Sequence, residues 1–395
     1  MNVRSFMIFI HTADWQLGKP FARISHPDKA ARVRSERIAA IKRIGTIAKE
    51  KQAEFVLVAG DVFDSFTADK STVSAACSAI GEIGIPVVAI PGNHDHGGPG
   101  CLWEQDFFKK ECESLAPNFQ ILLEHRPLEL DSAVIFPCPL LRRHESVDPT
   151  EWLRSLDFEE LKIDTDKPRI VLAHGSVHGF DSSGSDDEDG ALGSPNLIAL
   201  DRLPASEFDF IALGDWHGTK EINPDAWYAG TPEIDRFPKG ENNDPGNALC
   251  VTVTRNGTPA VEKMATGKLG WHVINFEFAS DEDVSRLQET LTARIGSRAG
   301  EDLVHLTVNG SLGIGAATQL DELLDQWRSR LLRLKEKNYI RLAPSDDEIE
   351  ALTTRTGDPL IANVALGLMP DTEGESDAAE VARIALRELY GAINP

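Results

Sequence analysis

The chain lacks the features of a disulfide-stabilised or membrane-spanning protein. Its five cysteines, an odd number, form no CxxC pair, which argues for reduced thiols rather than a disulfide framework or a zinc knuckle. No apolar stretch approaches the roughly 20 residues that a membrane helix needs. The short apolar start is typical of a first strand, not of a signal peptide. We therefore expect a soluble, cytoplasmic protein with no membrane partner.

Positive charge is also scarce. The chain has 40 Lys and Arg against 63 Asp and Glu, a net charge of −23. Such an acidic surface repels phosphates and counts against nucleic acid as a partner. Residues 19–51 are the exception, with ten basic and three acidic residues and a charge of +7. The simpler interpretation of that segment is a solvated helix face.

The 395 residues, 41% of them hydrophobic, are enough for two domains with a real core. Apolar runs at 6–10, in "FVLVAG" and in "IPVVAIPG" predict strands, and helical patterns at 28–50 and 69–82 separate them. This alternation predicts an α/β layer structure. Later strands follow one another without long helices, which predicts mixed or antiparallel pairing. They are expected at 119–123, 133–136, 169–173, 208–213, 219–223, 226–229, 248–254 and 259–265.

The pattern restarts near residue 269. "WHVINFEF" and "LVHLTVNG" predict strands, and 282–297 and 317–335 predict helices, which together form a smaller α/β unit. The tail "DAAEVARIALRELYGAI" is an amphipathic helix whose default role is core packing, with docking on a partner as the alternative. We expect three parts, 1–268, 269–345 and 346–395, and a mobile acidic loop at 181–190.

Polar side chains follow five of the predicted strands. Because ligand sites of α/β sheets gather at the carboxyl edge of the strands, these side chains are candidate ligands. Each segment alone is a weak signal, but their joint order and spacing are a strong one. They are Asp14 and Gln16 in "HTADWQLG", Asp61 and Asp64 in "GDVFD", Asn93 and His94 in "PGNHDH", His174 in "LAHGSVHG", and Asp215 and His217 in "ALGDWHG".

Together these segments resemble the calcineurin-like metallophosphoesterases, over residues 6 to about 265. With "YAGTPE" (228–233), they look most like the DNA double-strand-break repair nucleases of the SbcD and YhaO types. The resemblance implies an α/β fold with two packed mixed β-sheets flanked by helices. It also implies a smaller C-terminal α/β cap domain.

The resemblance further implies two divalent metal ions bridged by Asp61. The first site would be completed by Asp14, Gln16 and His217, and the second by Asn93, His174 and Asp215. Oxygen-rich ligands favour Mn²⁺, with Mg²⁺ as the alternative. Asp64 would orient a neighbouring ligand rather than bind metal.

The implied catalytic residues are His94, Asn93 and Asp61. A hydroxide that bridges the two ions would attack phosphorus in line. His94 would stay off the metals and, when protonated, stabilise the developing charge or give a proton to the leaving oxygen.

Two ligands depart from the family pattern. Gln16 and Asp215 each stand where His is usual. Gln offers a weaker neutral donor and Asp adds negative charge, so we expect a looser first site and a harder ion in the second. A decayed centre, kept for structure or partner binding, is the alternative interpretation.

The leading hypothesis is a metal-dependent DNA nuclease, a DNA repair exonuclease subunit whose cap guides DNA to the metals. By resemblance its partners would be an SMC-like ATPase of the SbcC type and a second copy of the chain. Candidate DNA contacts in the basic segment are Lys19, Arg23, Arg32 and Arg34. Two alternatives stay open: a phosphodiesterase or phosphatase acting on a small molecule or protein, and a non-catalytic scaffold subunit with a degenerate metal site.

Overall fold

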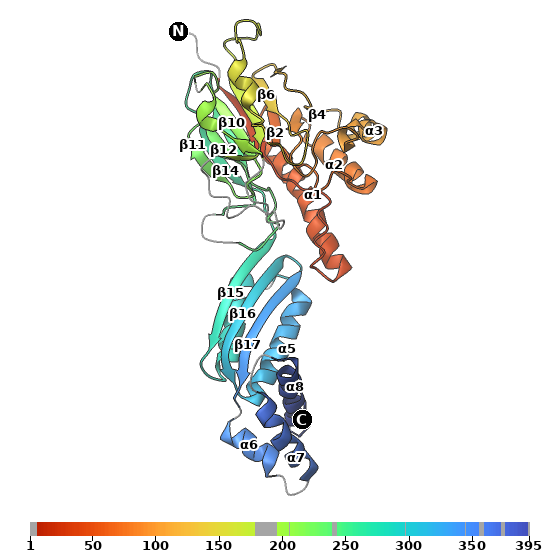
Figure 1. The fold of residues 1–395 in the computed structure, drawn as a ribbon, viewed down its shortest axis with the longest axis vertical. Coiled ribbons are helices and arrows are strands. Elements are labelled where there is room, and N and C mark those ends of the chain that lie inside the picture. The colour runs from red at the N-terminus through yellow and green to blue at the C-terminus, as the bar shows by residue number, and fades with distance from the viewer. Residues whose placement is uncertain are drawn as a thin grey trace. The chain divides into compact units, whose positions relative to one another are not determined.

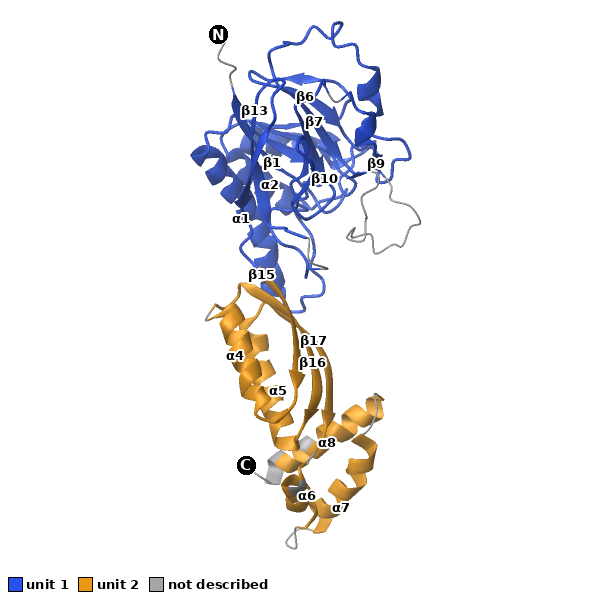
Figure 2. Cartoon of the chain, turned by 90° about the vertical axis from the view of Figure 1, so that its left-hand side faces the viewer, with its two compact units in different colours: residues 1–269 blue, residues 270–395 orange. Residues whose placement is uncertain are grey.

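The computed structural model describes residues 6–177, 196–204, 206–238, 243–296, 298–343, 345–354, 359–372 and 376–393. Contacts divide the chain into two compact units, Met1–Leu269 and Gly270–Pro395 (Figure 2). The segment from 346 onward, set apart in the sequence, groups with the second unit. The acidic loop expected at 181–190 lies outside the described residues.

The first sheet of unit 1 has the strand order β14-β13-β1-β2-β3-β4 (Figure 1). β1 to β4 are parallel, whereas β13 runs antiparallel to both β1 and β14. The sheet is therefore mixed, as the sequence predicts. Its strands are β1 (Met7–Thr12), β2 (Phe55–Ala59), β3 (Val87–Ile90), β4 (Phe119–Ile121), β13 (Asn247–Val253) and β14 (Ala260–Ala265).

The second sheet has the order β11-β12-β10-β7-β6-β5. Its four central strands, β12, β10, β7 and β6, are parallel, and both edge strands are antiparallel to their neighbours. The strands are β5 (Leu128–Glu129), β6 (Val134–Cys138), β7 (Arg169–His174), β10 (Phe210–Gly214), β11 (Lys220–Asn223) and β12 (Ala226–Tyr228); β8 (Ser176–Val177) and β9 (Leu197–Ile198) form a separate short pair.

The two sheets pack face to face through one apolar core. Phe9 of β1 stacks on Phe55 of β2 at 5.3 Å between ring centroids and meets Phe210 of β10 edge-on at 5.6 Å. Strands covered on both sides need continuous apolar runs, which explains segments such as "FVLVA". The predicted α/β fold with two packed mixed sheets is confirmed.

Helices cover the outer face of the first sheet, where Ile41 and Ile44 of the longest helix are fully buried. They are α1 (Pro27–Glu50), α2 (Lys70–Gly81), α3 (Asp106–Leu115) and the short η1 (Leu102–Glu104). The second sheet buries its outer face under loops and short turns that include η2 (Glu151–Ser155) and η3 (Leu200–Arg202). Each sheet thus has a core on both faces.

Unit 2 is built on a parallel sheet of order β15-β16-β17, with helices on one face. Leu306, Val308 and Leu324 are among the buried residues that join the sheet to these helices. The elements are β15 (Gly270–Phe278), α4 (Asp283–Ile295), β16 (Asp302–Leu312), α5 (Ile314–Arg330), β17 (Arg333–Leu342), α6 (Asp346–Thr353), α7 (Pro359–Leu368), η4 (Met369–Thr372) and α8 (Asp377–Ile393).

The helix predicted at 317–335 is wrong at its C-terminal end. α5 stops at Arg330, Leu331 has an extended backbone (φ −77°, ψ 150°), and β17 begins at Arg333. β17 is an edge strand whose Leu334, Ile340 and Leu342 pack on the core while Lys337 is exposed. Such a half-exposed charged strand carries a weak apolar signal, so the Leu- and Lys-rich sequence resembled a helix. Among the described residues, every helix is too short or too polar to span a bilayer.

Candidate metal centre

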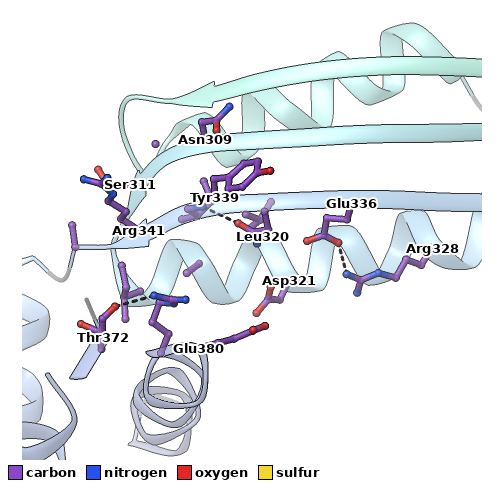
Figure 3. Close-up of a pocket in the computed structure, with 17 residues that line it drawn as sticks. Asn309, Ser311, Leu320, Asp321, Arg328, Glu336, Tyr339, Arg341, Thr372 and Glu380 are labelled. Atoms are coloured by element: carbon purple, nitrogen blue, oxygen red, sulfur yellow. Dashed lines mark hydrogen bonds and ion pairs between the residues drawn. The ribbon is translucent and has the colours of Figure 1, made fainter. Parts of the chain in front are cut away.

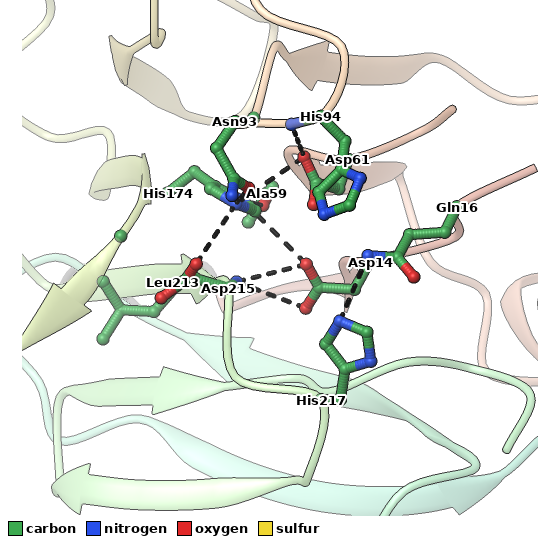
Figure 4. A network of polar contacts seen from close by, with 12 residues as sticks. Asp14, Gln16, Ala59, Asp61, Asn93, His94, His174, Leu213, Asp215 and His217 are labelled. Carbon is green, nitrogen blue, oxygen red and sulfur yellow. Dashed lines mark hydrogen bonds and ion pairs between the residues drawn. The ribbon is translucent and has the colours of Figure 1, made fainter. Parts of the chain in front are cut away.

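The predicted ligands come together because their strands end at one edge (Figure 4). Asp14 and Asp61 follow β1 and β2, Asn93 follows β3, His174 is the last residue of β7, and Asp215 follows β10. β1, β2 and β3 belong to the first sheet, and β7 and β10 to the second. The centre therefore lies across the carboxyl edges of both sheets, where α/β proteins place their ligand sites.

Four predicted ligands have left-handed backbone conformations. The φ angles are +53° at Asp14, +41° at Gln16, +53° at Asp61 and +107° at Asp215. Such angles are strained for side-chain-bearing residues and persist only where surrounding contacts hold them. Here the loops hold one another, because Gln16 N donates to Asp61 O at 2.8 Å.

The tightest cluster consists of Asp14, Asp61 and His174, whose candidate ligand atoms all lie within 4.8 Å of one another. His174 Nε2 lies 3.0 Å from Asn93 Oδ1, 3.7 Å from Asp61 Oδ1 and 3.8 Å from Asp215 Oδ1. Its Nδ1 lies 2.8 Å from the carbonyl oxygen of Ala59 and must donate a proton to it. This leaves the Nε2 lone pair directed at the cluster, as a metal ligand requires.

Burial and the mutual repulsion of the carboxylates shift the pKa values of this cluster. Burial, aided by the Asp61 and Asp215 carboxylates, raises the pKa of Asp14 to about 8 despite the opposing charge of His174. Burial would lower the pKa of His174, but the same three carboxylates outweigh it and raise that pKa to about 9. Burial also acts to raise the pKa of Asp61, yet His174 and His94 outweigh it and lower that pKa. A buried cluster of this kind is one that a cation stabilises.

Two glycines make room for the cluster. A Cβ on Gly92 would come within 2.1 Å of Asp61 Oδ1, and one on Gly60 (φ +85°) within 2.3 Å of His174 Nδ1. Only glycine fits either place. Carboxylate and amide oxygens lie close to one imidazole in this cluster, and this donor set fits a divalent ion of the manganese or magnesium type.

The other half of the predicted centre is arranged differently. Gln16 Nε2 lies 3.3 Å from His217 Nε2, and Lys19 Nζ donates to Gln16 Oε1 at 2.7 Å. Lys19 Nζ also binds Asp235 Oδ2 at 2.8 Å, and the same oxygen lies 3.1 Å from His217 Nδ1. Gln16, His217 and Asp235 are buried. Burial lowers the pKa of His217 although Asp235 opposes it. The distances above show that these side chains bind one another.

His94 lies beside Asp61. Its backbone N–H donates to Asp61 Oδ1 at 2.9 Å, and its Nδ1 lies 3.0 Å from the backbone carbonyl of Asp64. Burial lowers the pKa of His94, but the Asp61 carboxylate and the Asp64 carbonyl outweigh it and raise that pKa. The contact from Asp64 thus comes from its main chain. His11 is buried, with Nε2 3.2 Å from Leu213 O, and burial lowers its pKa to about 3.

Three supporting residues were missed in the sequence. The buried Arg37 guanidinium donates to the carbonyls of Asp14 and Trp15 at 3.0 and 2.8 Å, which fixes the first ligand loop. Asp95 accepts from the N–H groups of Gly92 and Phe63 at 2.8 and 2.9 Å. Asp235, described above, is the third. The "NHD" motif could have indicated Asp95, but Arg37 and Asp235 carry no local signal.

The basic segment is largely engaged within the protein. Lys19 donates to the side chain of Gln16. Arg32 pairs with Glu36, and Arg34 donates to the Pro20 carbonyl at 3.2 Å. Arg43, Lys42 and Lys51 also pair with carboxylates, those of Glu233, Glu82 and Glu262 respectively. The simpler interpretation, a solvated helix face, fits Lys42, which is exposed, but not Arg37, which is buried. Arg23 is also exposed and has an interaction partner.

A broad hollow lies in unit 2 between α5, β17 and α8 (Figure 3). Its walls are mainly polar, and Arg328 Nη2 pairs there with Glu336 Oε2 at 2.6 Å. Arg383 donates to the Thr372 carbonyl at 2.9 Å. Within the described residues, the close-set group of potential metal ligands is Asp14, Asp61 and His174 of unit 1, so this hollow shares no residue with it.

Comparison with known proteins identifies the family of this chain. The family model "Calcineurin-like phosphoesterase" matches residues 7–237. The uncharacterized metallophosphoesterase YhaO of Bacillus subtilis (strain 168) is 35% identical over 407 residues, which cover 95% of this chain and 89% of that protein. The crystal structure of TT1561 of Thermus thermophilus aligns with 66% of this chain and 100% of its own, with a TM-score of 0.39 and 12% identity. The chain therefore belongs to the calcineurin-like phosphoesterases, metal-dependent hydrolases of phosphoric esters.

Proposed function

We propose that the chain is a metal-dependent nuclease that hydrolyses phosphodiester bonds of DNA, as a DNA repair exonuclease subunit. The observation that carries this proposal is the convergence of Asp61, Asn93 and His174 beside His94. A divalent cation bound there, with manganese favoured, would polarise the phosphoryl oxygens and lower the pKa of a water molecule. The remaining steps belong to the side chains of the protein.

His94 is the proposed proton donor. Because a carbonyl oxygen only accepts, Nδ1 of His94 carries the proton shared with Asp64 O, and Nε2 is left for substrate. The raised pKa of His94 favours its protonated form. A protonated imidazole beside the ester stabilises negative charge on the leaving oxygen and can protonate it.

The "YAGTPE" segment supports the nuclease over other esterases by resemblance, and its contacts link it to the centre. Thr231 accepts from Arg37 at 3.1 Å, and Arg37 holds the Asp14 loop. Glu233 accepts from the N–H groups of Lys268 and Leu269 at 3.0 Å, the residues that lead into unit 2. The motif thus ties the first ligand loop to the connection between the units.

A second candidate is a phosphodiesterase acting on a small molecule. The net charge of −23 and the engagement of the basic segment within the protein favour it.

For the nuclease, we propose that an SMC-like ATPase of the SbcC type supplies the positive surface that a DNA substrate needs. A homodimer is the further assembly that we propose.

One assay separates these functions. Protein with Mn²⁺ is offered single-stranded DNA, double-stranded DNA and a chromogenic phosphodiester, with an N93A/H94A double variant as control. Cleavage of DNA by wild type alone supports the nuclease. Hydrolysis of only the small ester supports the second candidate. Inactivity on all substrates, with the ATPase partner present, contradicts both and favours a scaffold.

A further inference from the structure

The half of the centre around Gln16 is a closed ring of four side chains. Lys19 contacts both Gln16 and Asp235, Asp235 contacts His217, and His217 contacts Gln16, at 2.7, 2.8, 3.1 and 3.3 Å in turn. Asp235 comes from the segment after "YAGTPE", 216 residues from Lys19. The ring therefore depends on the folded protein, not on a local sequence motif.

The lysine determines which way the Gln16 amide points. An ammonium group only donates, so it requires the carbonyl oxygen of Gln16 rather than the NH₂ group. The NH₂ group must then face His217, as it does at 3.3 Å. With the opposite orientation the NH₂ group would face the Lys19 ammonium, and two donors would oppose each other. The carbonyl expected to bind metal is thus occupied by Lys19.

Both ring nitrogens of His217 also have partners within the ring of four side chains. The Asp235 carboxylate can only accept, so Nδ1 of His217 donates to it. Nε2 then carries the lone pair that a metal ion would need, and this lone pair faces the Gln16 NH₂ group. Gln16 and His217, two of the ligands predicted for the first site, therefore offer no free donor atom unless the ring opens.

Charge adds to this effect. A divalent ion binds a carbonyl oxygen at about 2.0–2.6 Å. An ion on Gln16 Oε1 would share that oxygen with an ammonium nitrogen 2.7 Å away. Like charges at such separations repel strongly inside a protein. Within the part of the chain that the structure describes, the contacts of Asp61, Asn93 and His174 given above include no Lys or Arg side chain.

We propose that this chain holds a single divalent ion, in the cluster of Asp14, Asp61, Asn93, His174 and Asp215. The ammonium group of Lys19 takes the place of the other ion. Lys19 then provides fixed positive charge on the Gln16 side of the centre. This inference rests on the metal centre alone and not on DNA as the substrate.

The test is metal stoichiometry with full-length protein. Wild type, Q16H/K19M and K19R are dialysed against micromolar Mn²⁺, and bound manganese is measured by mass spectrometry and by electron paramagnetic resonance. We expect one ion per chain and an uncoupled Mn²⁺ spectrum for wild type and for K19R, which keeps the charge. Q16H/K19M should bind two ions with an exchange-coupled spectrum. K42A removes a lysine of α1 that pairs with Glu82 at the end of α2, so it is the matched control and should behave as wild type.

Two coupled ions in wild type would overturn the inference, even if Q16H/K19M fails to fold. A folded Q16H/K19M that still binds one ion would also overturn it. DNA cleavage is measured separately on the same samples. Wild type with one ion and no nuclease activity leaves this inference standing and removes the proposed function, whereas a two-ion nuclease does the reverse.

Discussion

Nδ1 of His94 lies 3.0 Å from the backbone carbonyl of Asp64. Because the contact uses the main chain, D64N should keep the orientation of His94. We expect D64N to reduce kcat by less than about tenfold, whereas H94Q should lose about 10²- to 10⁴-fold, the usual contribution of a general acid. Steady-state kinetics on a chromogenic phosphodiester measures both. An equal loss in the two variants would show that the Asp64 carboxylate, not its carbonyl, orients the imidazole.

Metal binding should stabilise the protein. The buried carboxylates around Asp61 repel one another without a cation, so Mn²⁺ should raise the melting temperature. An ion at 100 times its Kd adds about 2.7 kcal/mol to the free energy of unfolding. D61N should lose this response, while D131N, which removes an exposed carboxylate, should keep it. Differential scanning calorimetry with and without a chelator is the measurement, and an unchanged response in D61N would contradict the assignment.

A methyl group at residue 92 should block the centre. In G92A the new Cβ would lie 2.1 Å from Asp61 Oδ1, and it would also meet the Asp61 backbone N at 2.6 Å. We expect loss of Mn²⁺ binding in calorimetric titration and a lower melting temperature. G367A is the comparison, because nothing lies within 4 Å of its Cβ and Ala suits helix α7. Normal metal binding by G92A would mean that Asp61 can move aside at no cost.

Acid stability should depend on the cap of α2. Hydrogen bonds from Ser71 and Thr72 lower the pKa of Asp69 from 3.8 to about 2. A pKa lowered by folding gives stability that is fully present above 3.8 and is lost as the pH falls toward 2. Wild type should therefore lose more stability than D69N between about pH 4 and pH 2. Urea unfolding across this range tests it, and since Asn also caps helices, the difference reports charge. Parallel curves would contradict the assignment.

Local patterns were sufficient to predict the ligand-bearing loops. Asp61 follows "FVLVA" and His174 ends "RIVLAH". The end of a buried strand can be recognised in the sequence by a change from apolar to polar residues. The α/β architecture followed from the same runs. Residues next to each other in sequence encode this information, so one chain was enough.

Long-range pairings could not be predicted in this way. Nothing near Lys19 indicates that it meets Asp235, and nothing near Arg37 indicates a buried guanidinium that binds the Asp14 and Trp15 carbonyls. Both were interpreted as surface cations because charge alone favours exposure. Their partners are set by how the loops cross, which depends on backbone angles such as the +41° at Gln16. The strand β17 was not predicted for a related reason. Only its position at the edge of the sheet explains its exposed charged residues.

The centre takes Asp61 from one sheet and His174 from the other. A cation bound to both residues would link the two sheets. Sliding one layer over the other would then have to break coordination bonds as well as the contact between Phe9 and Phe210. The mechanical strength of this domain therefore depends on the bound metal ion. Loss of the ion should weaken the packing between the two sheets and also stop hydrolysis.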